Sequence, residues 1–154
     1  MDLSDLIEVS AIMPALKANS KKQVLQLLAE KAARITGLPE REIFDTVLRR
    51  EKLGSTGVGN GIAIPHGKIP GVRRIAGVFA RLEQPVDFDS LDDQPVDLVF
   101  LLLAPEGAGA DHLKALARVS RLLRDEAICQ KLRGTDNQDA LYALLADRTE
   151  TSAA

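Results

Sequence analysis

The sequence predicts an α/β fold, a single-domain sandwich in which helices lie on both sides of a central mixed β-sheet. Three apolar segments of strand length, centred near residues 62, 75 and 98, occupy the middle of the chain. Segments with helical periodicity precede and follow them, which favours a layered arrangement. Because the 154 residues contain no low-complexity linker, we expect residues 1–154 to form one domain with an ordered core of about residues 3–147.

The first third of the chain predicts a short helical turn, an extended piece and two helices. Residues 3–16 contain scattered apolar residues and a proline, which indicate the turn and the extended piece. Ser20 is a candidate N-cap for a helix whose apolar residues repeat until Gly37. Pro39 then opens a second helix, because proline is tolerated in a first turn, and this helix continues to Leu53.

The segment that follows, residues 54–68, reads GSTGVGNGIAIPHGK. Its glycines predict a flexible loop, and Ile62–Pro65 predicts a short buried strand. Proline cannot donate to a sheet ladder, so we expect the strand to stop at Pro65 and to present His66 at its end. Gly67 allows a tight turn or the close approach of another group.

The second half of the chain predicts two more strands followed by helices. Val72–Leu82 is expected to be a strand, and Gln84–Pro95 an acidic loop with a short extended piece. Val96–Ala104 is apolar almost without alternation, which is typical of a strand covered on both faces. Asp111 is a candidate N-cap for a helix over His112–Asp125. Two short helices (residues 127–133 and 137–145) and a frayed tail (residues 147–154) complete the prediction.

Composition excludes several classes of function. A net charge of −2, 3% aromatic residues and no tryptophan disfavour nucleic-acid binding. A lone cysteine excludes a disulfide framework. The longest apolar run is far shorter than the ~20 residues that cross a bilayer, and the N-terminus does not resemble a signal peptide. We therefore expect a cytoplasmic protein that is not integral to the membrane.

The two histidines are the candidate reactive residues. The glycine-rich segment does not fit a P-loop, because Ile62 stands where the lysine belongs and a helix precedes the loop. No histidine or cysteine spacing indicates a metal site, so neither a metal nor a cofactor is expected. His112, taken alone, is more often an ordinary helix residue. His66 is a functional candidate, because glycine and proline constrain the chain on both sides of it.

Arg50 lies in the basic end of the second predicted helix. Cations there can simply compensate the helix dipole. The same side chain can also direct its donors at an anion beside His66. A neutral imidazole is a competent nucleophile near neutral pH, and if it receives a phosphoryl group, catalysis consists mostly of positioning and charge stabilisation. Arg50, the glycine-rich backbone and the start of the His112 helix would supply that stabilisation.

Three motifs carry a family resemblance. They are REKLGSTG from Arg50, IAIPHG around His66, and DHL from Asp111. Together they resemble the IIA proteins of the bacterial phosphoenolpyruvate-dependent phosphotransferase system (PTS), in their fructose/mannitol type, and most closely the nitrogen-regulatory branch. The resemblance covers nearly the whole chain and implies the type-2 IIA fold.

The resemblance implies roles for individual residues. His66 would accept a phosphoryl group on Nε2, while His112 and Arg50 would stabilise it without being phosphorylated. We also expect phosphate-binding groups in the glycine-rich segment, at Ser55, Thr56, Gly57 and Gly67. The protein would then be a carrier with a phosphohistidine intermediate rather than a free-standing turnover enzyme.

The resemblance also implies partners. The donor would be a phosphohistidine of an HPr-like carrier, called NPr in the nitrogen branch. Regulated proteins would include potassium transporters or sensor kinases, since no IIB or IIC segment is attached. A sugar-specific IIA that passes its phosphoryl group to a separate IIB is the alternative. A binding module with an inert histidine is a third hypothesis.

Overall fold

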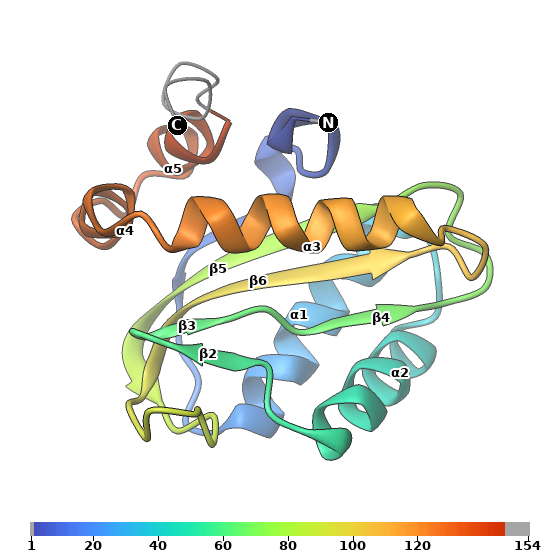
Figure 1. Ribbon diagram of the computed structural model, residues 1–154, viewed down its shortest axis with the longest axis horizontal. Helices are drawn as coiled ribbons and strands as arrows, with labels where there is room; N and C mark the ends of the chain where they lie inside the picture. The colour runs from blue at the N-terminus through green and yellow to red at the C-terminus, as the bar shows by residue number, and fades with distance from the viewer. Residues whose placement is uncertain (1, 147–154) are drawn as a thin grey trace.

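The computed structural model describes residues 2–146, which form a six-stranded mixed sheet with helices on both faces (Figure 1). The elements are η1 (Leu3–Asp5), η2 (Val9–Ala11), β1 (Ile12–Leu16), α1 (Lys21–Thr36), α2 (Glu40–Leu53), β2 (Gly57–Gly59), β3 (Ile62–Ala63), β4 (His66–Lys68), β5 (Ala76–Val86), β6 (Val96–Ala104), α3 (Ala110–Leu123), α4 (Glu126–Arg133) and α5 (Gln138–Leu145). The tail predicted at residues 147–154 lies outside the described residues. The α/β sandwich expected from the sequence is confirmed.

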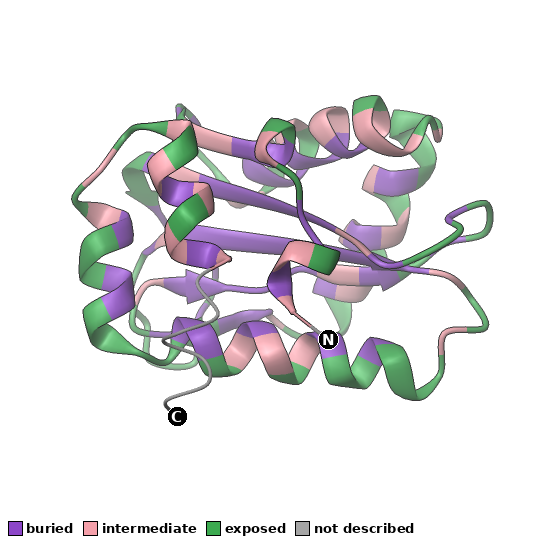
Figure 2. Cartoon of the chain, turned by 90° about the horizontal axis from the view of Figure 1, so that it is seen from above, coloured by how far each residue is buried: buried purple, intermediate pink, exposed green. Residues whose placement is uncertain are grey.

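The strand order is β1-β5-β6-β3-β2, and β4 pairs with β6. β5 and β6 are antiparallel, whereas β1 runs parallel to β5 and both β3 and β4 run parallel to β6. β6 is the central strand: every residue from Leu98 to Ala104 is at most 1% exposed. Figure 2 shows the same burial along the middle of the sheet. The unalternating apolar run is thus covered on both faces, as predicted.

The helices form a layer on each face of the sheet. α1 and α2 pack on one face, and α3 crosses the other face over β5 and β6 (Figure 1). Ser20 caps α1 by accepting the Gln23 N–H, and Gly37 ends it with a φ of 76°, so both predicted boundaries are confirmed. No described helix is long and apolar enough to cross a membrane.

The glycine-rich segment is more ordered than the predicted flexible loop. Gly57–Gly59 forms β2, which pairs antiparallel with β3. Asn60 and Gly61 connect the two strands, with φ values of 56° and 81°. Two central residues with positive φ are the signature of a tight hairpin turn, and Asn-Gly is the dipeptide that favours it. The prediction of a flexible loop was therefore wrong over this part.

The strand predicted over Ile62–Pro65 is shorter than expected, because β3 ends at Ala63, and pairing with β6 resumes at His66. β3 and β4 both pair with β6, and Pro65 lies between them. Proline lacks an N–H, but its carbonyl still accepts the Leu102 N–H at 2.9 Å. The chain therefore stays beside β6 through Pro65, and His66 opens β4 instead of ending a strand.

Two other boundaries differ from the predictions. β5 begins at Ala76 and continues to Val86, where a loop was expected, because Val86 pairs with Val96 beyond an irregularity in the ladder. α3 begins at Ala110 with Gly109 as its N-cap, so Asp111 lies within the first turn and does not cap the helix. His112 still lies in the first turn, as predicted.

Candidate functional site

His66 is held by a hydrogen bond that defines which of its ring nitrogens carries the hydrogen. Its Nδ1 lies 2.9 Å from the Ile64 carbonyl oxygen. A carbonyl can only accept, so Nδ1 must carry the hydrogen. In the neutral ring the other nitrogen, Nε2, then has a free lone pair. The backbone around Pro65 thereby selects the tautomer in which Nε2 carries the free lone pair.

His112 lies in the first turn of α3, on the face of the sheet opposite α2, and its imidazole lies beside that of His66. The ring centroids of His66 and His112 are 5.7 Å apart, and the planes meet at 69°. His112 is only 6% exposed, and its Nε2 is buried without a hydrogen-bond partner among the described residues. A buried polar atom without a partner is uncommon, which makes this nitrogen a candidate ligand-binding atom.

A cleft of about 290 Å³ lies beside the two rings. Its lining comes from the last turns of α2, from β4 and from the start of α3: Thr46, Arg49, Arg50, Leu53, His66, Gly67, Lys68 and His112. This lining contains three cationic side chains and no carboxylate. The cleft is therefore suited to an anion. Within residues 2–146, no cluster of three or more His, Cys, Asp or Glu residues could hold a metal ion.

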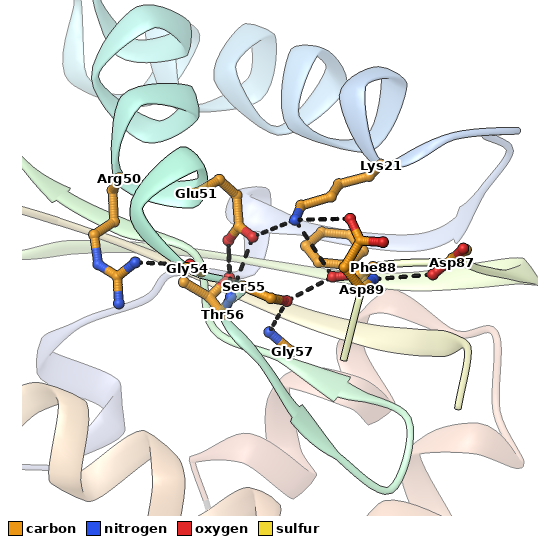
Figure 3. A network of polar contacts seen from close by, with 10 residues as sticks. All are labelled: Lys21, Arg50, Glu51, Gly54, Ser55, Thr56, Gly57, Asp87, Phe88 and Asp89. Carbon is orange, nitrogen blue, oxygen red and sulfur yellow. Dashed lines mark hydrogen bonds and ion pairs between the residues drawn. The ribbon is translucent and has the colours of Figure 1, made fainter. Parts of the chain in front are cut away.

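Arg50 lies in the last turn of α2, with part of its guanidinium already engaged. Its Nη1 donates to the Gly54 carbonyl at 2.8 Å, which satisfies a group at the end of the helix (Figure 3). The structure gives its other nitrogens no hydrogen bond to a described residue. Helix termination and anion binding, the two interpretations of this arginine, are thus compatible.

The predicted phosphate-binding residues separate into two groups. Gly67 lines the cleft, and a Cβ at this position would lie 2.8 Å from Cγ2 of Thr46, so glycine lets β4 approach α2 closely. Ser55, Thr56 and Gly57 do not line it. Instead, the Ser55 hydroxyl donates to the Phe88 carbonyl and accepts the Gly57 N–H. The polar groups of these three residues organise the loop.

The sequence did not point to Glu51 and Lys21, which form a network of polar contacts beside the loop (Figure 3). Glu51 is 5% exposed, accepts both the N–H and the hydroxyl of Thr56, and pairs with Lys21 Nζ at 2.6 Å. Its position was readable, because it follows the buried Ile43 and Val47 at a spacing of four residues. The surrounding basic residues made the whole segment look exposed.

Burial lowers the pKa of both histidines. For His66, burial is the largest cause; the Ile64 hydrogen bond opposes it, and the nearby charges of Arg50 and Glu51 act in opposite directions. For His112, burial again dominates, with smaller contributions from His66 and Lys68. Both rings are therefore neutral at pH 7, which leaves the lone pair of His66 Nε2 available.

These shifts predict how stability depends on pH. The unfolded histidines titrate near a pKa of about 6.5, and the folded ones below it. Their contribution is therefore fully present above about pH 6.5 and is lost as the pH falls toward the folded pKa, because the unfolded chain binds protons first. Urea titrations of the wild type and of a double variant, His66→Gln with His112→Gln, should show a steeper loss of stability for the wild type between about pH 6.5 and 5. Equal slopes would contradict the lowered pKa values.

Comparisons with known proteins identify the family of this chain. The family model of the phosphoenolpyruvate-dependent sugar phosphotransferase system, EIIA 2, matches residues 5–148. The nitrogen regulatory protein of Bradyrhizobium diazoefficiens is 61% identical over 153 residues, covering 99% of this chain and 100% of the relative. The nitrogen regulatory protein of Escherichia coli K12 is 41% identical over 152 residues, with coverages of 98% and 93%. The crystal structure of the nitrogen regulatory protein IIA-Ntr from Neisseria meningitidis matches with a TM-score of 0.88 at 34% identity, covering 93% of this chain and 98% of that one.

A mixed sheet that carries a histidine with a free Nε2, together with a match over most of the chain, defines the class. The chain belongs to the EIIA type-2 family of the phosphoenolpyruvate-dependent phosphotransferase system. Within that family, the relatives compared above are nitrogen regulatory proteins, and this chain is similar to them along nearly its whole length. The family predicted from the sequence motifs is confirmed.

Proposed function

We propose that this protein is a cytoplasmic phosphoryl carrier of the nitrogen-related phosphotransferase system, and that His66 Nε2 accepts the phosphoryl group from a phosphohistidine of an HPr-like carrier, NPr. The observation that carries the proposal is the hydrogen bond from His66 Nδ1 to Ile64, which leaves Nε2 unprotonated beside a cationic cleft. We also propose that residues 1–154 form a single EIIA type-2 domain, as the sequence predicts.

The transfer balances without a base. The His66 Nε2 lone pair forms the new bond to phosphorus, while the bond from phosphorus to the donor's imidazole nitrogen breaks and returns its electron pair to the donor. Nδ1–H remains bonded to the Ile64 carbonyl throughout. The donor and acceptor are both imidazoles, so the protein's task is to hold the phosphoryl oxygens and the attacking nitrogen in line.

Arg50 and His112 would stabilise the phosphoryl oxygens. Arg50 has donors left after its bond to Gly54, and a guanidinium fork fits a phosphoryl group. His112 presents a buried Nε2 without a partner. In the Nε2–H tautomer it would donate to a phosphoryl oxygen, which would supply the missing partner.

His112→Ala is expected to slow phosphoryl acceptance by about 10²-fold while leaving the protein labelled, since loss of one donor to a developing anion costs about that much. His112→Gln, which keeps an N–H donor, should recover part of the rate. Initial rates of label transfer from the phosphorylated carrier measure both variants. An unchanged rate in His112→Ala would remove His112 from the site.

Regulation would follow from charge. A phosphate on His66 adds nearly two negative charges to a cleft that Leu53 lines, and Leu53 and Leu113, the residue after His112, are 84% and 70% exposed. A partner that covers these leucines would bind the phosphorylated form more weakly, because the phosphate would be desolvated and would repel acidic groups of the partner. The phosphorylated and free forms should therefore select different partners, and potassium transporters or sensor kinases are the candidates.

The test is reconstitution with phosphoenolpyruvate, enzyme I and NPr. The proposal predicts acid-labile label on this protein that depends on both upstream proteins. No label, with a carrier that is itself phosphorylated, would overturn it and favour a binding module with an inert histidine.

The family model describes a sugar phosphotransferase component, which supports a second candidate function. In that case a IIB domain of the fructose/mannitol type would remove the label from His66 rapidly. Persistence of the label in the presence of IIB favours the regulatory function.

A further inference from the structure

Glu51 is an unusual residue to find buried beside an anion-binding cleft. It lies in the last turn of α2 and is 5% exposed; it does not line the cleft, and its carboxylate points to Thr56 and Lys21, while the guanidinium of its neighbour Arg50, which does line the cleft, points to Gly54 (Figure 3). A buried carboxylate is costly unless several donors satisfy it. Glu51 receives the Lys21 ammonium at 2.6 Å, the Thr56 N–H at 3.1 Å and the Thr56 hydroxyl.

These contacts continue to the reactive histidine through two backbone hydrogen bonds. The Thr56 carbonyl accepts the Ile64 N–H at 3.0 Å. The Ile64 carbonyl in turn accepts Nδ1–H of His66 at 2.9 Å. Thr56 is therefore fixed at both of its ends: its N–H and hydroxyl donate to Glu51, and its carbonyl accepts the N–H of Ile64. Ile64 is fixed by Thr56 and presents its own carbonyl to the imidazole.

The position of the Ile64 carbonyl decides the tautomer of His66. If that carbonyl moves, Nδ1 loses its acceptor, and the neutral ring is free to place its hydrogen on Nε2 instead. An Nε2–H ring has no lone pair there. A displacement of the Ile64 carbonyl would thus remove the lone pair from His66 Nε2 without the substitution of any residue that lines the cleft.

We propose that Glu51, paired with Lys21, is a positioning residue that fixes His66 in the Nδ1–H tautomer through Thr56 and Ile64. Its importance for phosphoryl transfer rests on the function proposed above, but the tautomer itself is a property of the free protein. The opposing hypothesis is that Glu51 only joins the end of α2 to the following loop and contributes to stability alone.

The test combines two readouts on the full chain. Long-range proton–nitrogen NMR of the neutral ring identifies which nitrogen of His66 carries the hydrogen, and initial rates of label transfer from phosphorylated NPr report its reactivity. The variants are Glu51→Ala and the isosteric Glu51→Gln, which accepts fewer hydrogen bonds. Leu28→Ala is the control, because it opens a cavity in the buried face of α1 without touching the network.

The wild type and Leu28→Ala should show only the Nδ1–H tautomer. Glu51→Ala should show a mixture in which the Nε2–H tautomer predominates, with acceptance slowed in proportion to the Nδ1–H fraction that remains, about 10-fold where about one ring in ten keeps it. Glu51→Gln should lie between them, which keeps the test valid if Glu51→Ala does not fold.

Two results would overturn the proposal: a pure Nδ1–H tautomer in the folded Glu51 variants, or the same mixture in Leu28→Ala. A wild type that shows the Nδ1–H tautomer but accepts no label would refute the proposed function and leave the tautomer assignment standing.

Discussion

His66→Ala is expected to abolish phosphoryl acceptance, with label falling to background. Nε2 of His66 is the nucleophile of the proposed transfer, and alanine offers no atom that can bond to phosphorus. His112 lies 5.7 Å away, ring centroid to ring centroid, but it is 6% exposed, so it should not replace His66 as acceptor. Autoradiography after incubation with phosphoenolpyruvate, enzyme I and NPr measures the loss.

Two controls accompany this variant. A urea titration shows whether His66→Ala folds, which is expected because the side chain is only half-buried. His66→Gln replaces the ring with a side chain of comparable polarity and should be equally unreactive. Residual stoichiometric label on either variant would place the acceptor elsewhere.

Arg50→Ala is expected to reduce the rate of acceptance by about 10²- to 10³-fold, the effect of removing a preorganised donor to a developing charge. The change leaves Arg49 and Lys68 as the cations of the cleft. It removes the guanidinium of Arg50, which the hydrogen bond to the Gly54 carbonyl already holds in place. Arg50→Lys should recover only part of the rate, since an ammonium cannot bind two oxygens in a plane. Initial rates at several carrier concentrations separate weaker docking from slower transfer.

Arg49→Ala is the matched control, because Arg49 also lines the cleft and carries the same charge. If long-range attraction alone matters, the two variants should lose activity equally and salt should remove the difference from wild type. A specific role for Arg50 predicts a larger loss that persists at high ionic strength. Equal effects would contradict that role.

Much of the fold could be predicted because local signals and tertiary structure agree. The apolar run of β6 has no alternation, and the strand is covered on both faces. Ser20 and Gly37 delimit α1 through their own backbone and side-chain chemistry. Such boundaries depend on a few neighbouring residues, so a single sequence contains the information for them.

The errors arose where pairing partners decide the outcome. Pro65 does not turn the chain away from β6, because its carbonyl accepts the N–H of Leu102, nearly forty residues further along the chain. The Asn60-Gly61 turn could have been recognised from its dipeptide, but the short strands beside it contain too few residues to show alternation.

Part of the candidate site could likewise be predicted from local sequence, and part of it depends on contacts that only the structure shows. The glycines and the proline around His66 marked it in the sequence, and the structure brings Arg50 from α2 and His112 from α3 to it, beside Gly67 of its own strand β4. The sequence could not show that polar groups of Ser55 and Thr56 are already bonded within the protein, to Phe88 and Glu51, because only coordinates reveal such partners.

Long-range proton–nitrogen NMR of the phosphorylated protein tests the central claim most directly, because it identifies the nitrogen that carries phosphorus. The account predicts phosphate on Nε2 of His66 alone, with Nδ1 still protonated by virtue of its bond to Ile64. Phosphate on Nδ1 of His66, or on His112, would contradict it.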